Sequence, residues 1–172
     1  MNERISIKQL SEMNEVKMLN TEFAKYYPWF TQSRYHESCL EENQNGTRVT
    51  LLAYYDGILA GCCHLLYISK YPHFVSREIP EINDLNVFPQ YRNKRIASAL
   101  FDRLEGIAAE NSSYVGLGVG LYKDYGNAQR MYGQRGYVLD GEGLMYGNNA
   151  VRPGETVRVD DELLLYLIKQ LI

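Results

Sequence analysis

The stretch LNVFPQYRNKRIASAL, from Leu85 to Leu100, carries the strongest structural signal in this sequence. It predicts a strand over residues 80–87, a polar and basic loop, and an amphipathic helix from about residue 96. The first N–H groups of a helix have no partner inside the helix, and its dipole adds partial positive charge there. With the basic side chains of the loop, these groups suit a pyrophosphate. The alternative interpretation is a basic turn that is merely solvated.

Elements predicted on either side of this stretch alternate between strands and helices. Apolar periodicity predicts strands at residues 5–8, 47–55, 58–67, 114–121 and 137–146, the last one broken, and helices at 11–26, about 31–43, 96–111 and 127–134. Asp56-Gly57 is a hairpin turn signal, Ser11 a helix N-cap candidate, and residues 69–79 are expected to form a loop. Gly136 is expected to end the helix at 127–134 in a C′ position. The block 163–171 fits a helix or a strand, and we favour a buried strand. The pattern indicates an α/β fold in a single domain, residues 1–172.

Composition excludes several classes of protein. The 172 residues carry 18 Lys and Arg against 21 Asp and Glu, a net charge of −3, which disfavours a nucleic-acid partner. Apolar runs are too short for a membrane span, and no export signal precedes the first strand, so we expect no membrane partner. Three Cys without a C-x-x-C pair and three His without ligand spacing indicate no metal and a reduced, cytoplasmic protein.

Two common nucleotide-binding motifs are missing. The sequence contains no G-x-x-x-x-G-K-[ST], and Gly116, Gly118 and Gly120 lack the third glycine of G-x-G-x-x-G. These three glycines fall on one face of the predicted strand. They are therefore expected to permit the close approach of another backbone or of a ligand.

Two blocks resemble the GNAT N-acetyltransferase superfamily. Residues 91–100 resemble its acyl-CoA signature [QR]-x-x-G-x-[GA], with Arg92 in the first position, Ala97 in the last, and Arg95 where the family usually has glycine. Residues 127–137 resemble a second family segment. In this segment the positions in register are Asn127, Tyr132, Gly136 and Tyr137.

The resemblance implies a mixed, mostly antiparallel sheet of about seven strands, flanked by helices and splayed at the acyl-CoA site. It also implies acetyl-CoA as co-substrate and no metal. By family register, Leu85, Asn86 and Val87 expose backbone groups that bind the pantetheine, and the Val87 N–H polarises the acetyl carbonyl. The implied phosphate-binding positions are Arg92, Asn93, Lys94, Arg95, Ile96, Ala97 and Ser98.

The same register implies catalytic roles. Tyr132 matches the tyrosine that protonates the departing thiolate, and a phenol with an ordinary pKa of about 10 is protonated at neutral pH. Glu81 stands where one branch of the family has a general base; Asp84 or a chain of waters are the alternatives. Asn127 is expected to cap its helix and to contact the pantetheine or phosphate arm.

The implied activity is transfer of an acetyl group from acetyl-CoA to a primary amine, by direct attack in a ternary complex. A GNAT-fold module that binds acyl-CoA without turnover is the alternative. The acceptor, a small molecule or peptide, is left open between polyamine, aminoglycoside, amino acid and peptide N-terminus, and a homodimer is possible. Residues expected near the acceptor are Tyr26, Tyr27, Trp29, Phe30, Glu41, Glu42, Tyr67, Tyr71, His73 and Phe74.

Overall fold

The structure is a computed structural model that describes residues 4–31 and 33–171. Contacts between residues divide the chain into two compact units: residues 1–67 with 82–107, and residues 68–81 with 108–172. We describe each unit by itself. No helix in the described part of the chain is long and apolar enough to cross a membrane.

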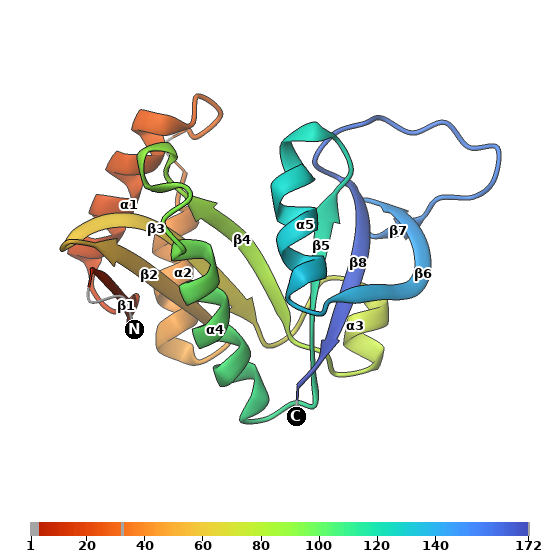
Figure 1. Cartoon of the computed structure of the whole chain (residues 1–172), viewed down its shortest axis with the longest axis horizontal. Coiled ribbons are helices and arrows are strands. Elements are labelled where there is room, and N and C mark those ends of the chain that lie inside the picture. Colours follow the sequence, from red (N-terminus) through yellow and green to blue (C-terminus); the bar gives the residue numbers. More distant parts are fainter. Residues whose placement is uncertain (1–3, 32, 172) are drawn as a thin grey trace. The chain divides into compact units, whose positions relative to one another are not determined.

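The first unit is built on the strand order β1-β2-β3-β4 (Figure 1). Its elements are β1 Ile5–Gln9, α1 Met13–Tyr26, α2 Tyr35–Asn45, β2 Arg48–Tyr55, β3 Ile58–Leu66, β4 Glu81–Val87, η1 Pro89–Tyr91 and α4 Ile96–Ala109. Strands β2 and β3 are antiparallel, and Asp56 and Gly57 join them with φ of 49° and 79°. Positive φ at both residues matches the twist of the hairpin, as the Asp-Gly pair predicts.

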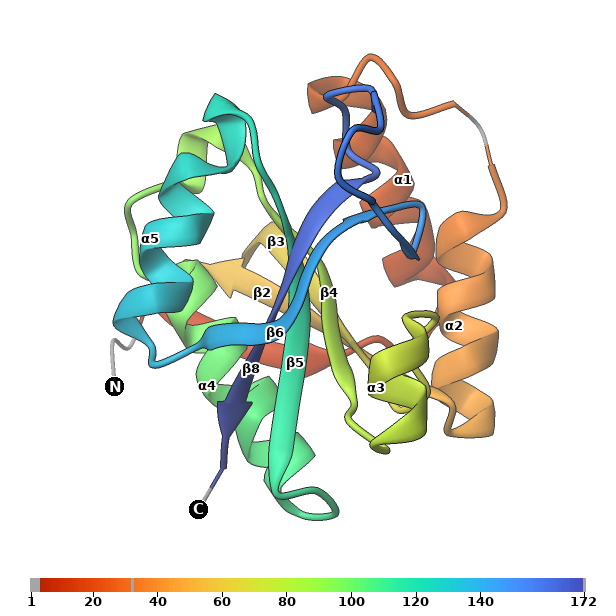
Figure 2. The same cartoon turned by 90° about the vertical axis from the view of Figure 1, so that its right-hand side faces the viewer.

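The core of this unit lies between the sheet and its helices. Val16, Leu19 and Phe23 on one face of α1 pack with Leu52 of β2 and Cys62 of β3. Figures 1 and 2 show α1 and α2 on one face of strands β2 and β3, with α4 on the other. The three cysteines are free and buried, as expected for packing residues.

One glycine lets strands β3 and β4 approach closely. A Cβ on Gly61 would lie 2.3 Å from the carbonyl oxygen of Asn86 and 3.0 Å from the Cα of Val87. Next to this contact, the Phe88 N–H donates to the Ala60 carbonyl at 2.9 Å. The end of β4 is therefore held against a position where only glycine fits.

The second unit has the strand order β5-β8-β6-β7. Its elements are α3 Pro72–Ser76, β5 Tyr114–Gly120, η2 Lys123–Tyr125, α5 Gly126–Gln134, β6 Val138–Tyr146, β7 Asn149–Ala150 and β8 Leu163–Gln170. Figure 2 shows α3 and α5 on opposite sides of β5 and β8. Glu81, the first residue of β4, pairs in parallel with Gly116 of β5. The C-terminal block, whose composition fits a helix or a strand, is the strand that we favoured.

The three glycines of β5 make room for aromatic rings. A Cβ on Gly116 would lie 2.3 Å from the ring of Phe74, and one on Gly120 would lie 2.3 Å from the ring of Tyr125. At Gly118 the nearest atom belongs to the ring of Tyr166, 3.0 Å away. The expected neighbour, a backbone or a ligand, was wrong because side chains from the same unit fill this space.

In the described residues the expected fold class is confirmed: a mixed, mostly antiparallel sheet, with eight strands rather than about seven, is flanked by five α-helices. The expected break in the strand over residues 137–146 is confirmed, because the pairing of β6 with β8 shifts register between Leu139 and Leu144. Three local expectations were wrong. A short helix, α3, interrupts the expected loop, and helix α2 begins at Tyr35 rather than near Thr31. Glu12, not Ser11, is the N-cap of α1, because Glu15 folds back to accept from the N–H groups of both residues. Gln32, within the expected second helix, lies outside the described residues.

Candidate active site

The loop between β4 and α4 presents a row of backbone donors in the first unit. In the described chain, no hydrogen bond is found for the backbone N–H groups of residues 93–98. The next N–H, of Ala99, is the first to bond back, to the Arg95 carbonyl at 3.1 Å. Unpartnered N–H groups at the start of a helix are suited to an anion, as the sequence predicts.

Two residues of this loop have a left-handed backbone. Asn93 has φ of 60° and Arg95 has φ of 64°. Glycine adopts this conformation without strain, whereas a residue with a Cβ does so at a cost. Arg95 thus keeps a backbone conformation that suits glycine although it carries a long side chain. The departure from the family signature changes the side chain and leaves the turn in place.

Replacing Arg95 by glycine is expected to stabilise the ligand-free protein by up to about 1 kcal/mol. Relief of the left-handed strain is worth about 1–2 kcal/mol, and the greater freedom of glycine in the unfolded chain offsets about 0.5–1 kcal/mol. Thermal melting should show a rise of roughly 2–4 °C for a domain of this size. Arg92→Gly is the control, because Arg92 has φ of −64° and no such strain to relieve. A melting temperature of Arg95→Gly at or below wild type contradicts the prediction.

The basic side chains of the loop surround these donors. Arg92 and Arg95 are exposed, and the Arg92 Nε donates to the Val87 carbonyl at 3.4 Å. The Lys94 ammonium lies 5.1 Å from the centre of the Tyr55 ring. Ile96 is buried and anchors the helix, while Ala97 and Ser98 are half-buried. The site therefore combines backbone dipoles with positively charged side chains.

The backbone conformation and the burial of strand β4 change in its middle. Asp84 has φ of 49°, the one positive φ of a non-glycine residue inside a strand of the described chain. After it, Leu85, Asn86 and Val87 are half-buried, so they are neither packed away nor fully solvated. Leu85–Val87 thus lie directly before the loop between β4 and α4, in the same unit. The resemblance to the family implies that they bind the pantetheine.

Glu81 lies in the second unit and is 7% exposed. Its Oε2 accepts a hydrogen bond from the Ser69 hydroxyl, whose oxygen in turn accepts the Tyr71 N–H at 2.9 Å. Because the Tyr71 N–H occupies a lone pair of Ser69, the hydroxyl hydrogen is directed to Glu81. The proposed base therefore has a fixed carboxylate in a buried setting.

Helix α5 of the second unit carries the other predicted residues. Tyr132 is buried, with its ring 6.0 Å from that of Tyr137. Gly136 ends the helix region with φ of 89°, the C′ role that the sequence predicts. Asn127 is not the cap, which corrects our expectation: the helix begins one residue earlier, at Gly126, and Asn127 is exposed in its first turn.

The aromatic residues expected around the acceptor divide into different roles. Tyr71 and Phe74 are fully buried in the core of the second unit, with Tyr71 stacked on Tyr166 at 3.6 Å. In the first unit, Tyr26, Tyr27 and Phe30 pack on the core cluster, while Trp29 is 65% exposed. Tyr67 is exposed, and His73 faces Glu142 at 3.7 Å.

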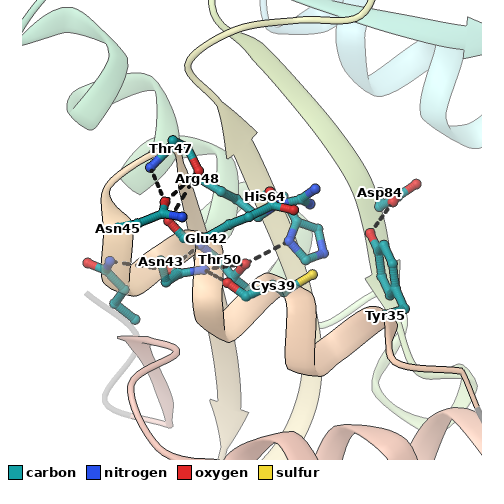
Figure 3. Close-up of polar contacts among 11 residues, drawn as sticks. Tyr35, Cys39, Glu42, Asn43, Asn45, Thr47, Arg48, Thr50, His64 and Asp84 are labelled. Carbon is teal, nitrogen blue, oxygen red and sulfur yellow. Dashed lines mark hydrogen bonds and ion pairs between the residues drawn. The ribbon is translucent and has the colours of Figure 1, made fainter.

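Neither of the two expected acids on α2 is free. Glu41 pairs with Arg34 at 3.1 Å, and Glu42 pairs with the Nε of the buried Arg48 at 2.7 Å (Figure 3). Sequence analysis missed Tyr35, which donates a hydrogen bond to Asp84. These two residues are far apart in the sequence, so no local pattern signals the contact.

Comparison with known proteins identifies the family. Residues 16–137 match the family model described as the acetyltransferase (GNAT) family, which is most of the chain. The chain therefore belongs to the GNAT acetyltransferase family. No curated protein sequence matches it.

Solved structures share the fold over nearly the whole chain. An acetyl transferase from Salmonella typhimurium, which modifies the N-terminal serine of ribosomal protein L7/L12, has a TM-score of 0.72 at 12% identity, covering 99% of this chain and 97% of its own. The dodecameric spermidine N-acetyltransferase of Vibrio cholerae has 0.67 at 15%, covering 98% and 95%. A putative acetyltransferase from Salmonella typhimurium, with its cofactor acetyl-CoA, has 0.66 at 16%, also covering 98% and 95%.

Proposed function

We propose that this protein is an N-acetyltransferase that moves the acetyl group of acetyl-CoA to a primary amine in a ternary complex. The observation that carries the proposal is the row of unpartnered N–H groups at residues 93–98, with Arg92, Lys94 and Arg95 around it. Backbone donors at a helix start, joined by positive side chains, suit the pyrophosphate of CoA. Family membership supports the acetyl donor, as does the relative solved with acetyl-CoA.

The chemistry assigns one role to each proposed residue. The amine nitrogen attacks the thioester carbon, the C–S bond breaks, and the amine loses one proton while the thiolate gains one. Glu81 accepts the proton of the amine, Tyr132 donates to the sulfur, and the Val87 N–H stabilises the developing oxyanion. Amide formation from a thioester needs no metal for this proton balance.

Thermal melting with and without acetyl-CoA tests the proposal. Acetyl-CoA at about 100 times its dissociation constant should stabilise the protein by about 2.7 kcal/mol. The second arm measures CoA-thiol release with a polyamine, an aminoglycoside, an amino acid and a peptide with a free N-terminus. Desulfo-CoA, which keeps the phosphates but lacks the thioester, is the control ligand for the first arm.

The two arms separate the enzyme from the alternative. Stabilisation together with CoA release from one class of amine supports the enzyme. Stabilisation without release from any amine favours an acyl-CoA-binding module without turnover. No stabilisation overturns the assignment of residues 93–98 as the phosphate site.

A further inference from the structure

A groove on the surface of the first unit lies between helix α1 and the β2–β3 hairpin. Its volume is about 400 Å³, and we call it the α1 groove. Leu59 is buried in its lining, whereas Met18 and Ile58 are 40% and 60% exposed. Exposed apolar side chains from two different elements thus share one concave surface. The residues that line the groove are Lys17, Met18, Thr21, Glu22, Gly57, Ile58 and Leu59.

The groove uses a face of α1 that the core leaves free. Val16, Leu19 and Phe23 of this helix are buried in the core of the first unit. Residues 17, 18, 21 and 22 form two i, i+4 pairs, so they lie together on another face. Apolar surface that is rimmed by polar residues is typical of an interaction site.

The two charged residues of the groove have opposite signs. Lys17 is exposed, and in the part of the chain that the structure describes no carboxylate lies within 4.0 Å of its ammonium. Glu22 lies 3.8 Å from Lys25 on the same helix, and an exposed pair of this kind is weak. Neither charge therefore has a strong partner within its own chain.

Opposite charges at two ends of one surface make that surface complementary to itself. Consider a two-fold axis that passes midway between Lys17 and Glu22, at right angles to the line that joins them. This axis brings Lys17 of each copy against Glu22 of the other, so two equivalent ion pairs form around the apolar side chains of the same contact. Two-fold contacts of one surface with itself are the commonest way in which identical chains assemble.

We propose that the α1 groove is the contact surface of a homodimer, in which a second copy of this chain is the partner. Charge complementarity favours this occupant, because a wholly acidic or wholly basic partner would place a like charge against Glu22 or Lys17. A second copy offers both signs at the matching spacing. The inference goes beyond acetyl transfer and does not depend on it, since no residue of the groove belongs to the proposed active site.

Sedimentation equilibrium across a dilution series tests the proposal. Wild-type protein should approach twice the mass of one chain as its concentration rises. Lys17→Glu and Glu22→Lys should each raise the dimer dissociation constant about 10–100-fold, because two-fold symmetry turns both ion pairs into like-charge contacts. The double variant Lys17→Glu/Glu22→Lys should return it to within about threefold of wild type, since opposite charges face each other again.

A mixture of the two single variants tests the pairing directly. The Lys17→Glu chain carries acids at both positions and the Glu22→Lys chain carries bases at both, so each ion pair of a mixed dimer joins opposite charges. The equimolar mixture should form dimers at concentrations at which each variant alone is a monomer. A general effect of either substitution on folding cannot produce this recovery.

Ile58→Lys tests the apolar part of the contact, and Val138→Lys is its matched control. Ile58 is the first residue of β3 and is 60% exposed; Val138 is the first residue of β6 and is 61% exposed. Ile58→Lys should raise the dimer dissociation constant about 10–100-fold, because it buries an ammonium without a partner. Val138→Lys should leave the constant unchanged. Both variants should melt close to wild type, since both positions are exposed.

Three results would overturn the proposal. The first is a wild-type protein that stays a monomer at every concentration. The second is a wild-type dimer that Ile58→Lys and both charge reversals leave unchanged, because it must use another surface. The third is a loss of dimer in the single variants without recovery in the mixture and the double variant, because Lys17 and Glu22 then do not face each other. Loss in the single variants followed by recovery in both supports the proposal.

Discussion

Gly61→Ala is expected to destabilise the protein by about 3 kcal/mol and to weaken its affinity for acetyl-CoA. The added Cβ would lie 2.3 Å from the Asn86 carbonyl oxygen and 3.0 Å from the Val87 Cα, and both are backbone atoms. Backbone cannot rotate away as a side chain can, so β3 and β4 must separate. The displaced residues are those that family register places along the pantetheine. Melting temperature should fall by roughly 6–12 °C.

Gly106→Ala is the matched control for this substitution. Gly106 is exposed on α4, and its Cβ would meet nothing within 4 Å. Alanine in an open helical position stabilises by about 0.5–1 kcal/mol. The two variants carry the same added methyl group, and the expected effects have opposite signs. Equal melting temperatures for Gly61→Ala and wild type would mean that β3 and β4 are not in close contact.

Tyr132→Phe is expected to lower kcat by about 100-fold or more while acetyl-CoA binding stays close to wild type. A positioned general acid contributes about 10²–10⁴-fold, and phenylalanine keeps the ring but cannot donate a proton to the thiolate. Steady-state release of CoA measures kcat, and the shift in melting temperature with acetyl-CoA measures binding. A role limited to packing predicts the opposite result, with kcat retained, because Phe preserves most of the buried ring.

Tyr137→Phe provides the comparison for Tyr132. Tyr137 is also buried, and its ring lies 6.0 Å from that of Tyr132. The Tyr137→Phe substitution also removes one phenolic hydroxyl, from a neighbouring ring of the second unit. An equal loss of kcat in both variants would assign the effect to the packing of these rings. A loss confined to Tyr132→Phe identifies a specific proton donor.

Much of the fold was predictable because its signals are local. The Asp56-Gly57 turn, the two strands that it joins and the glycine after α5 each depend on neighbouring residues. All three were confirmed. One error was local: the start of α1 depends on Glu15, three residues after the cap, whose side chain folds back. Another arose where distant residues decide the outcome, because rings from α3, η2 and β8 cover the glycines of β5.

The candidate site shows the same division. The loop of residues 93–98 was predictable, because a basic segment between a strand and a helix forms its donors within a few residues. The setting of the carboxylates was not, since Ser69 donates to Glu81 from the segment between β3 and α3, and Tyr35 donates to Asp84 from α2. The resemblance to the family indicates which residues could act, but it does not indicate which hydrogen-bond partners orient them.

The sequence by itself determined most of the order of strands and helices, the hairpin, the helix end at Gly136 and the row of backbone donors between β4 and α4. Hydrogen bonds and backbone preferences between near neighbours are sufficient for each of these features. Only the tertiary structure decided that Arg95 adopts a left-handed conformation, that Gly61 admits the backbone of β4, and that a tyrosine orients Asp84. These features depend on the register of strands and on the packing of helices, which bring together atoms that no spacing in the chain relates.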